Sequence, residues 1–239
     1  MLTLLDHFTL KIARSAEEID FLQHLRWAVY CREFGYEREE DCPGEREKDL
    51  FDPRSVHLYM QHRSTGHIAG VVRIIPANNF PADMRLPFEA AYQASGNSFD
   101  ADSDVSRDRI IEISRMAVAT EFRRRQGERG SPIGLGVMNE LASSARYFPL
   151  LPLSLYLSVA AHVELSGQHD TYGYAMMEPR LIRLLHRYGI HFAQVAPTIE
   201  YHGERAAYRI TLDDVFKNLK EDLRELYTGL RNILENEPS

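Results

Sequence analysis

Cysteine is scarce in this sequence, since Cys31 and Cys42 are the only two among 239 residues. Eleven positions apart, they fit neither a disulfide framework nor the paired spacing of a zinc site, and we expect both to be reduced and structural. The ten histidines show no H-E-x-x-H or comparable ligand spacing, so no metal is predicted.

Long apolar runs are also missing. The longest uncharged apolar stretch, about residues 148–163, contains Pro149 and Pro152 and is shorter than the ~20 residues that a membrane-spanning helix needs. The N-terminus has no basic region followed by an apolar block and a small-residue cleavage site. We therefore expect a cytoplasmic protein without a transmembrane segment.

Positive charge is in deficit, because 28 Lys and Arg face 35 Asp and Glu and leave a net charge of −7. Such a chain repels nucleic acid phosphates, and no nucleic acid partner is predicted. One dense basic cluster contains Arg123, Arg124, Arg125 and Arg129. Apolar residues make up 44 % of the chain, which is enough for a substantial core.

Local patterns predict alternating strands and helices, with no internal repeat or linker, and hence one domain over residues 1–239. Ser15 and Glu18 form a capping box that opens a helix. The other expected elements are strands over 8–14, 56–60, 68–75, 110–119, 153–159, 192–196 and 206–211, helices over 87–93, 137–147 and between Glu178 and Gly189, and loops over 35–54 and 76–108.

The C-terminal segment 212–235 carries apolar residues at alternating spacings of four and three, after a capping-box-like start at Thr211 and Asp214. This pattern predicts one amphipathic helix of about six turns. Two interpretations are open. The helix packs back on a core of about residues 8–211, or it forms a dimerising coiled coil between two copies of the chain.

A strand, an Arg- and Gly-rich loop and a helix follow one another over residues 110–147. Free main-chain amides and a helix N-terminus attract anions, so this order favours phosphate binding. The block contains neither a Walker A lysine motif nor G-x-G-x-x-G, and an ordinary solvated loop is the alternative interpretation.

Several motifs occur in order between residues 20 and 210. They are Arg26 with Tyr30, E-K-D-L-F-D at 47–52, G-V-V-R at 70–73, E-I-S-R at 112–115 and Y-H-G-E-R-A-A-Y at 201–208. Together they resemble the GNAT acyltransferases, in the branch of acyl-homoserine-lactone synthases, long-chain N-acyl amino acid synthases and PEP-CTERM/exosortase-associated acyltransferases. The last motif resembles the exosortase-associated and N-acyl amino acid subgroup most.

The resemblance implies an α/β (α+β) fold, with a mixed, mostly antiparallel sheet flanked by helices and two parallel strands splayed apart to admit a pantetheine arm. The acyl donor would be acyl-CoA or acyl carrier protein, with no tightly bound cofactor. Met116, Ala117 and Val118 would pair with pantetheine through main-chain atoms. The phosphate would be received by Arg123, Arg124, Arg125, Gly127, Gly134 and Gly136.

Transfer of an acyl group to an amine needs a base, since an ammonium has no lone pair. Glu112 is the candidate, because a carboxylate in an otherwise apolar strand is costly unless it is paired or functional, and burial would raise its pKa. Arg115 would point to the opposite face of an ideal strand, so either a bulge corrects its direction or the two residues do different jobs. A main-chain amide near Met116–Val118 is the candidate donor to the oxyanion.

Arg73 is another charge in an apolar strand, and buried arginine is uncommon without a carboxylate partner. Asp49 and Asp52, on the preceding loop as in the related synthases that the chain resembles, are the expected partners, with Arg26 beside them. Together with Tyr30, this network would either position the acceptor's carboxylate or hold the 35–54 loop over the site.

The leading hypothesis is an N-acyltransferase that moves a long-chain acyl group from acyl carrier protein or CoA to an amino acid or similar small amine. A lactone-type signal synthase and a non-catalytic acyl-binding protein are the alternatives. Lactone synthases usually carry Phe where Tyr30 stands, which makes that product doubtful. Candidates for lining an acyl tunnel are Leu150, Leu151, Leu153, Leu155, Met176 and Met177. Candidates for docking an acidic carrier are the arginine cluster with Arg180, Arg183 and Arg187.

Overall fold

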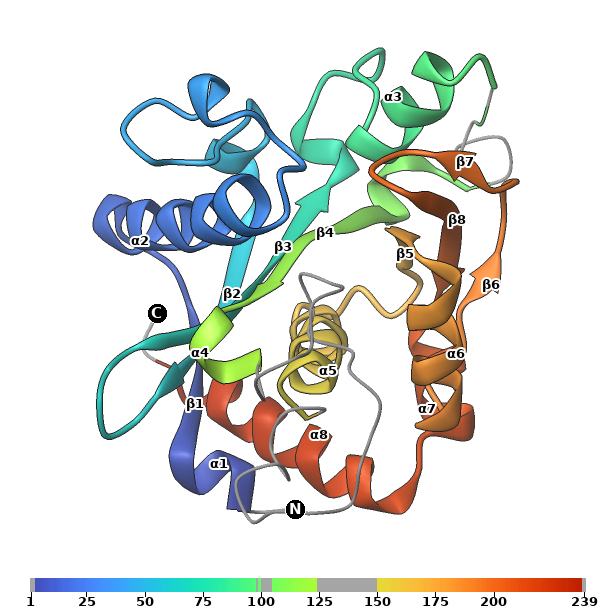
Figure 1. The fold of residues 1–239 in the computed structure, drawn as a ribbon. Coiled ribbons are helices and arrows are strands. Elements are labelled where there is room, and N and C mark those ends of the chain that lie inside the picture. Colours follow the sequence, from blue (N-terminus) through green and yellow to red (C-terminus); the bar gives the residue numbers. More distant parts are fainter. Residues whose placement is uncertain (1–2, 98, 100–104, 124–149, 238–239) are drawn as a thin grey trace.

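The computed structural model of the chain describes residues 3–97, 99, 105–123 and 150–237. In these residues a sheet runs in the order β1-β2-β3-β4-β5-β8-β6, and the short β7 pairs with β8 outside this path. The strands are β1 Phe8–Ile12, β2 Val56–His62, β3 Ile68–Pro76, β4 Ile110–Val118, β5 Tyr172–Met177, β6 Ala193–Gln194, β7 Ile199–Glu200 and β8 Glu204–Ile210. Paired strands are antiparallel except β4 and β5, which confirms the mixed sheet (Figure 1).

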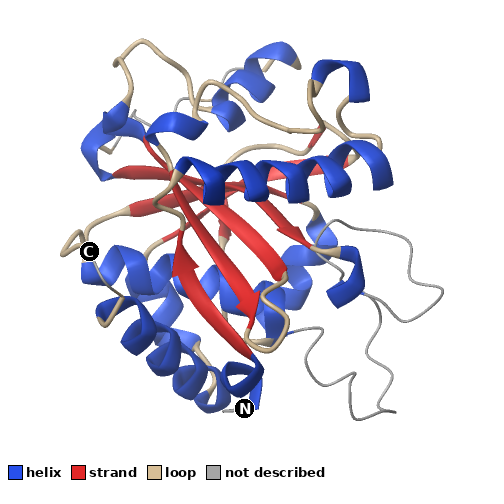
Figure 2. Ribbon diagram, turned by 90° about the vertical axis from the view of Figure 1, so that its left-hand side faces the viewer, coloured by secondary structure: helices blue, strands red, loops and turns tan. Residues whose placement is uncertain are grey.

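Helices cover both faces of this sheet (Figure 2). They are α1 Thr3–His7, α2 Ala16–Trp27, α3 Pro87–Ala94, α4 Thr120–Arg123, α5 Leu150–Leu165, α6 Pro179–Arg187, α7 Leu212–Asn218 and α8 Glu221–Glu235. Helix α2 packs on β3 and β4, whereas α5 packs on the other face, with α8 against it. None of the described helices is long and apolar enough to cross a membrane.

The predicted hairpin is present as β2 and β3, and its side chains sort by face. Leu58 and Met60 join the large apolar cluster that includes α5, while Tyr59 between them joins Val71 in the cluster under α2. Successive positions of a strand point to opposite faces, so the two helices bury both sides of the hairpin. The prediction that its second strand is buried is confirmed.

Helix α2 begins at the predicted capping box. The Ser15 hydroxyl accepts a hydrogen bond from the Glu18 amide at 3.1 Å, and the Glu18 carboxylate accepts one from the Ser15 amide at 3.0 Å. After Trp27 the helix continues as a π-helix over Ala28–Glu33, which the sequence pattern did not predict. Tyr30 lies in this π-helical segment.

The prediction of a strand over 153–159 is wrong, because these residues lie within the helix α5. The helix is apolar on every side and almost wholly buried, so its sequence has no amphipathic period to distinguish it from a buried strand. Pro152 is compatible with a helix here, since it lies in the first turn, where an amide hydrogen is not needed.

The single C-terminal helix predicted over 212–235 is also wrong, because α7 and α8 are separate. Thr211 and Asp214 do form the predicted capping box, but Leu219 is extended and buried between the two helices. A Cβ atom on Gly189, which has φ +83°, would come within 2.0 Å of the Asn218 carbonyl oxygen, so the glycine lets the α6 end pack against this break. The apolar face of α8 packs on α5, which agrees with packing back rather than with a coiled coil.

Helices α3 and α6 confirm the predictions for 87–93 and for the segment between Glu178 and Gly189. Strand β6 is shorter than the strand predicted over 192–196, whereas β8 begins two residues before the predicted 206–211 and ends one residue earlier. Strands β5 and β7 were not predicted. The predicted helix over 137–147 lies outside the described residues, as do Arg124, Arg125, Arg129, Gly127, Gly134 and Gly136.

Candidate active site

Strands β4 and β5 pair for only a short distance. Their parallel pairing begins at Ile110 with Tyr172 and ends at Glu112 with Tyr174, although both strands continue. A pocket of about 540 Å³ opens beyond that point, lined by Tyr30, Ile113, Ser114, Arg115, Met116, Tyr156, Ala175, Met176, Met177, Glu178, Leu181 and Arg205. We call it the β4–β5 slot. The separation expected between two parallel strands is therefore present.

A β-bulge in β4 corrects the direction of Arg115. Arg73 pairs with Ser114 and Val71 with Ala117, so Arg115 and Met116 stand opposite one residue of β3. Arg115 has φ +49°, a left-handed conformation that is strained for a residue with a side chain. As a result its guanidinium reaches the same pocket as Glu112, which settles the question that an ideal strand left open.

Glu112 is buried, with 3 % of its surface exposed, at the point where β4 and β5 part. One carboxylate oxygen accepts a hydrogen bond from the Phe88 amide, in the first turn of α3, at 3.2 Å. Burial raises the pKa of Glu112 to about 8, although the Phe88 amide and the charges of Arg73 and Arg115 oppose the rise. Near neutral pH a group with that pKa is partly ionised, and its carboxylate form can take up a proton.

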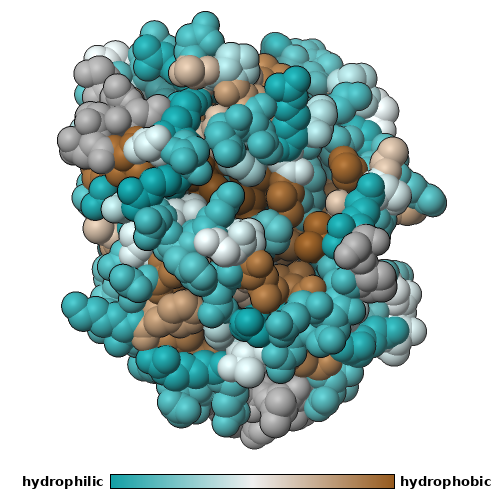
Figure 3. Space-filling model, turned by 180° about the vertical axis from the view of Figure 1, so that it is seen from behind, coloured by the Kyte–Doolittle hydropathy of each residue, from teal (hydrophilic) through white to brown (hydrophobic). Residues whose placement is uncertain are grey.

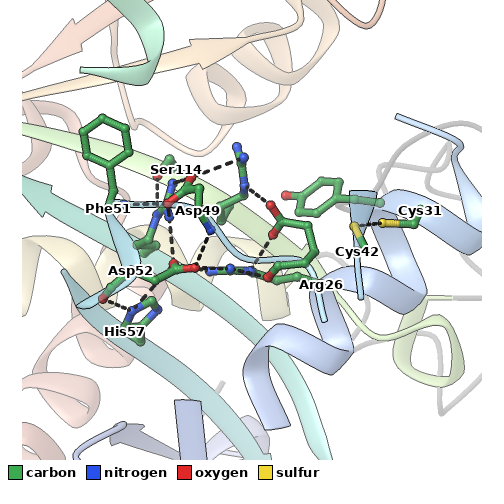
Figure 4. Close-up of polar contacts among 12 residues, drawn as sticks. Arg26, Cys31, Cys42, Asp49, Phe51, Asp52, His57 and Ser114 are labelled. Carbon is green, nitrogen blue, oxygen red and sulfur yellow. Dashed lines mark hydrogen bonds and ion pairs between the residues drawn. The ribbon is translucent and has the colours of Figure 1, made fainter. Parts of the chain in front are cut away.

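A buried ionic network fastens the 35–54 loop to the sheet and to α2 (Figure 4). Arg26 holds Asp52 with two hydrogen bonds, at 2.8 and 2.7 Å, and its Nε lies 2.7 Å from Glu47. Arg73 binds Asp49 in the same bidentate way, at 2.6 and 2.9 Å, and also reaches Asp52 at 2.7 Å. We call these five residues, with Arg115, the loop clamp.

The loop clamp has three cations and three anions. Burial raises the pKa of Asp52, but the hydrogen bonds and charge of Arg26 and the charge of Arg73 outweigh it and hold the pKa well below its usual range. Arg26 and Arg73 are fully buried, and their donors go to the clamp carboxylates, to the Glu47 carbonyl oxygen and to the Ser114 hydroxyl. This arrangement supports the second of the two roles left open by the sequence, which is to hold the loop in place.

Arg115 completes the clamp at its exposed end. Its Nε donates to Glu47 at 3.0 Å, and one of its terminal nitrogens lies 3.4 Å from Asp49. Close by, the Tyr30 hydroxyl donates to the Met116 carbonyl oxygen at 2.7 Å, which ties the π-helix to the bulge. Burial raises the pKa of Tyr30 to about 12, so the hydroxyl stays protonated.

A second pocket, of about 600 Å³, contains Glu112 and is called the Glu112 pocket. Its lining consists of Tyr30, Tyr36, Glu37, Pro87, Phe88, Glu112, Ile113, Ser114, Arg115, Met176, Tyr201, His202 and Arg205. Tyr36 stacks on Tyr30 at 6.2 Å and on His202 at 5.2 Å, measured between ring centroids. Burial raises the pKa of Glu37, whereas burial and the charges of Arg205 and Arg115 lower the pKa of His202.

Comparison with known proteins decides the fold. Residues 25–130 match the family model of the acetyltransferase (GNAT) domain. The AHL synthase LasI is 18 % identical, with a TM-score of 0.58 over 90 % of this chain and 97 % of that one. The chain has the GNAT fold. No curated protein sequence matches it.

Two further GNAT-fold structures are similar over nearly the whole chain. The CoA-dependent acyl-homoserine lactone synthase BjaI, with SAM and isopentyl-CoA, is 18 % identical, with a TM-score of 0.59 over 93 % of this chain and 89 % of that one. FeeM, an N-acyl amino acid synthase from uncultured soil microbes, is 13 % identical, with a TM-score of 0.55 over 91 % and 96 %. The family match and the shared fold support an acyltransferase enzyme.

Within this GNAT fold, the described part of the predicted phosphate site is Arg123. Its side chain is buried, donates a hydrogen bond to the carboxylate of Glu33 and lies over the ring of Phe34 at 5.0 Å. It therefore fastens α4 to the π-helix. The other predicted phosphate ligands lie outside the described residues, and their role stays a prediction.

An apolar cavity lies between α5 and the sheet, and Ile113 lines both this cavity and the Glu112 pocket. It is lined by Ile111, Ile113, Tyr156, Leu157, Val159, Ala160, Val163, Thr171, Gly173, Ile190, Phe192, Ile210, Thr211, Leu212 and Val215. Of the residues predicted to line an acyl tunnel, Met176 and Met177 line the β4–β5 slot instead, and Leu150–Leu155 belong to the core. From behind, apolar side chains gather across the middle of a mostly hydrophilic surface (Figure 3).

The cysteines are closer together than their spacing in the sequence indicated. Cys31 in the π-helix and Cys42 in the 35–54 loop are buried and free, with their sulfur atoms 3.1 Å apart (Figure 4). Burial and the hydrogen bond with Cys42 raise the pKa of Cys31 far above its usual value, which keeps it a thiol. In the described residues no group of three His, Cys, Asp or Glu side chains is placed to bind a metal.

Sequence reasoning did not single out several residues of the Glu112 pocket, among them Tyr36, Glu37, Tyr201, His202 and Arg205. A signal existed for three of them, because Y-H-G-E-R at 201–205 belongs to a motif that carried the resemblance. His202 has φ +52°, and Gly203 beside it φ +96°, so the motif forms a tight turn that projects side chains into the pocket.

Proposed function

We propose that this protein is an N-acyltransferase that moves a fatty acyl group from a phosphopantetheine thioester to the amine of an amino acid or a similar small acceptor. The observation that carries the proposal is a buried carboxyl group, with a pKa of about 8, at the fork between two parallel strands. The thioester would enter the β4–β5 slot, and the amine would occupy the Glu112 pocket.

In this mechanism Glu112, as carboxylate, removes a proton from the acceptor ammonium, directly or through one water. The free nitrogen attacks the thioester carbonyl carbon, so that a C–N bond forms and the C–S bond breaks. The thiolate leaves and takes a proton, giving an amide and a free pantetheine thiol. Main-chain amides near the bulge at Arg115 and Met116 are the proposed donors to the oxyanion, because a bulge leaves ladder groups without partners.

The apolar cavity is the proposed site for the acyl chain. Its lining is almost entirely hydrocarbon, and Ile113 and Tyr156 belong both to it and to the β4–β5 slot. Each methylene moved from water into such a cavity contributes ~0.8 kcal/mol. A chain long enough to fill the cavity is therefore the proposed donor substrate.

Helix α6 is the proposed docking surface for an acidic carrier protein. Glu178 and Leu181, at its start, line the β4–β5 slot. Arg180, Arg183 and Arg187 are all exposed on it. A carrier bound there would present its pantetheine arm close to the slot, and its attraction should weaken with salt.

The test is an assay of purified protein with palmitoyl-CoA or palmitoyl acyl carrier protein and a mixture of the proteinogenic amino acids. Release of free thiol and mass spectrometry of the products would be followed together. An N-acyl amino acid formed in step with thiol release supports the proposal. Thiol release without an amide, or no release with either donor, contradicts it.

A lactone-forming synthase is the second candidate, because LasI and BjaI, whose fold the chain shares, are named as such synthases. BjaI was solved with SAM, so one arm of the assay replaces the amino acids with SAM. An acyl-homoserine lactone in that arm, and no N-acyl amino acid in the other, favours this candidate. Retained acyl ligand without turnover in either arm favours a non-catalytic acyl-binding protein.

A further inference from the structure

Arg205 lies where the two working pockets meet. It is the second residue of β8, just after the tight turn at 202–203, and it lines both the β4–β5 slot and the Glu112 pocket. Its side chain is 17 % exposed. A cation in this position can contact a substrate that spans the two pockets.

The guanidinium of Arg205 has a donor that makes no hydrogen bond within the described part of the chain. This donor is its buried Nε–H. Among the described residues, the nearest carboxylate oxygen, on Glu178, is 3.7 Å from a terminal nitrogen, and Glu178 is bound more closely by Arg180, at 2.5 Å. The guanidinium carbon lies 5.3 Å from the centroid of the Tyr36 ring, a cation–π contact that helps to position the group.

The other basic side chains near the pocket are already paired with carboxylates or are neutral. Arg115 is bound to Glu47 and Asp49, and Arg26 and Arg73 are fully buried within the loop clamp. His202 is kept neutral, because burial and the neighbouring guanidinium groups lower its pKa. Arg205 is therefore the side chain in the described part of this pocket that is best able to receive an anion.

The same pocket has an acidic pole. Glu112 is proposed to face the acceptor's ammonium, and Glu37 lines the pocket as a second carboxyl group. A pocket with carboxyl groups and an open guanidinium matches a zwitterion. We propose that Arg205 is a specificity-determining residue, which binds the carboxylate of the acceptor and selects amines that carry a carboxylate over amines that lack one. This inference rests on the proposed function and names the residue that would recognise its acceptor.

The experiment compares an accepted amino acid with its own carboxamide, which keeps the amine and loses the anion. In wild-type protein the carboxamide should be a poorer acceptor by about 10–100-fold in kcat/KM, as expected for a charge-assisted bidentate contact. Arg205→Gln should raise the KM for the amino acid by a similar factor and leave the carboxamide unaffected. The matched control is Arg209→Gln on the same strand, whose guanidinium lies over Tyr172 at 5.2 Å, and it should preserve the discrimination.

Equal losses of kcat with both acceptors in Arg205→Gln would overturn the inference, since they would indicate a contact with the thioester oxyanion instead. Equal use of the two acceptors by wild-type protein would overturn it as well. If no amine is acylated at all, the proposed function fails separately. Calorimetric titration of the amino acid then tests Arg205 alone, with weaker binding to Arg205→Gln supporting the inference and unchanged binding overturning it.

Discussion

Replacing Glu112 with Gln should abolish most activity and, at alkaline pH, make the protein more stable. Gln keeps the shape of the protonated carboxyl group and can still accept the hydrogen bond from the Phe88 amide, but it cannot take up a proton. Loss of a general base typically costs about 10²–10⁴-fold in rate. In wild-type protein kcat/KM should rise with pH through about 8, as Glu112 gives up its proton.

The stability effect follows from the same pKa. The folded value of about 8 lies above the ordinary value of 4.5, so between these pH values the folded state holds a proton that the unfolded state has released. The contribution of Glu112 is therefore intact below 4.5 and is lost as the pH rises through 8. At 1.36 kcal/mol per unit, the full loss is on the order of 5 kcal/mol, an upper bound.

Urea unfolding at pH 5, 7 and 9 measures this effect as the difference between wild-type protein and Glu112→Gln. The variant should match wild-type stability at pH 5 and exceed it by a few kcal/mol at pH 9. The control is Glu17→Gln, at an exposed position of α2, which should change neither activity nor its pH dependence. Stability curves for Glu112→Gln and wild type that run parallel across this range, with activity retained, would refute the reasoning.

Three other perturbations test other parts of the molecule. Asp52→Asn should lower the free energy of unfolding in urea by about 3–5 kcal/mol, because it leaves buried Arg26 and Arg73 uncompensated. The control Asp41→Asn, in an exposed ion pair, should lower it by less than about 1 kcal/mol. Equal losses would contradict the loop clamp. Ala160→Phe should fill about four methylenes' length of the apolar cavity and lower kcat/KM for palmitoyl relative to octanoyl donors ~100-fold, whereas an unchanged ratio would place the chain elsewhere. Arg183→Glu should slow transfer from acyl carrier protein about tenfold at low salt but not from acyl-CoA, and equal slowing would argue against docking on α6.

The sequence predicted the elements that have a local signature. The capping box at Ser15, the hairpin turn and the proline at the first position of α6 each depend on a few adjacent residues, and the structure has all three. Glu112 and Arg73 were found because a charge in an apolar strand is conspicuous. Arg73 needed a carboxylate partner, and the resemblance to the related synthases pointed to Asp49 and Asp52, which the structure places there.

What the sequence could not predict depends on contacts between distant segments. Helix α5 has no polar face, so only its burial between the sheet and α8 distinguishes it from a strand. The break at Leu219 follows from packing against Gly189, which lies in another helix end. The motif at 201–208 drew attention to the segment of Arg205, but the significance of this residue comes from the two pockets that it joins and from the lack of a close carboxylate partner among the described residues, which a local pattern does not reveal.

The separation of β4 from β5 divides two kinds of selection between different parts of the chain. The Glu112 pocket is built chiefly by the π-helix, the 35–54 loop, α3, β4 and the 201–205 turn, while α5, α7, β8 and the paired ends of β4 and β5 enclose most of the apolar cavity; Ile113 lines both. Away from Ile113, substitutions at sites without shared partners usually have additive effects. Under the proposed function, substitutions in one pocket would change the amino acid head group of the product, and substitutions in the other would change its acyl chain. A small number of variants would therefore yield a combinatorial set of lipids.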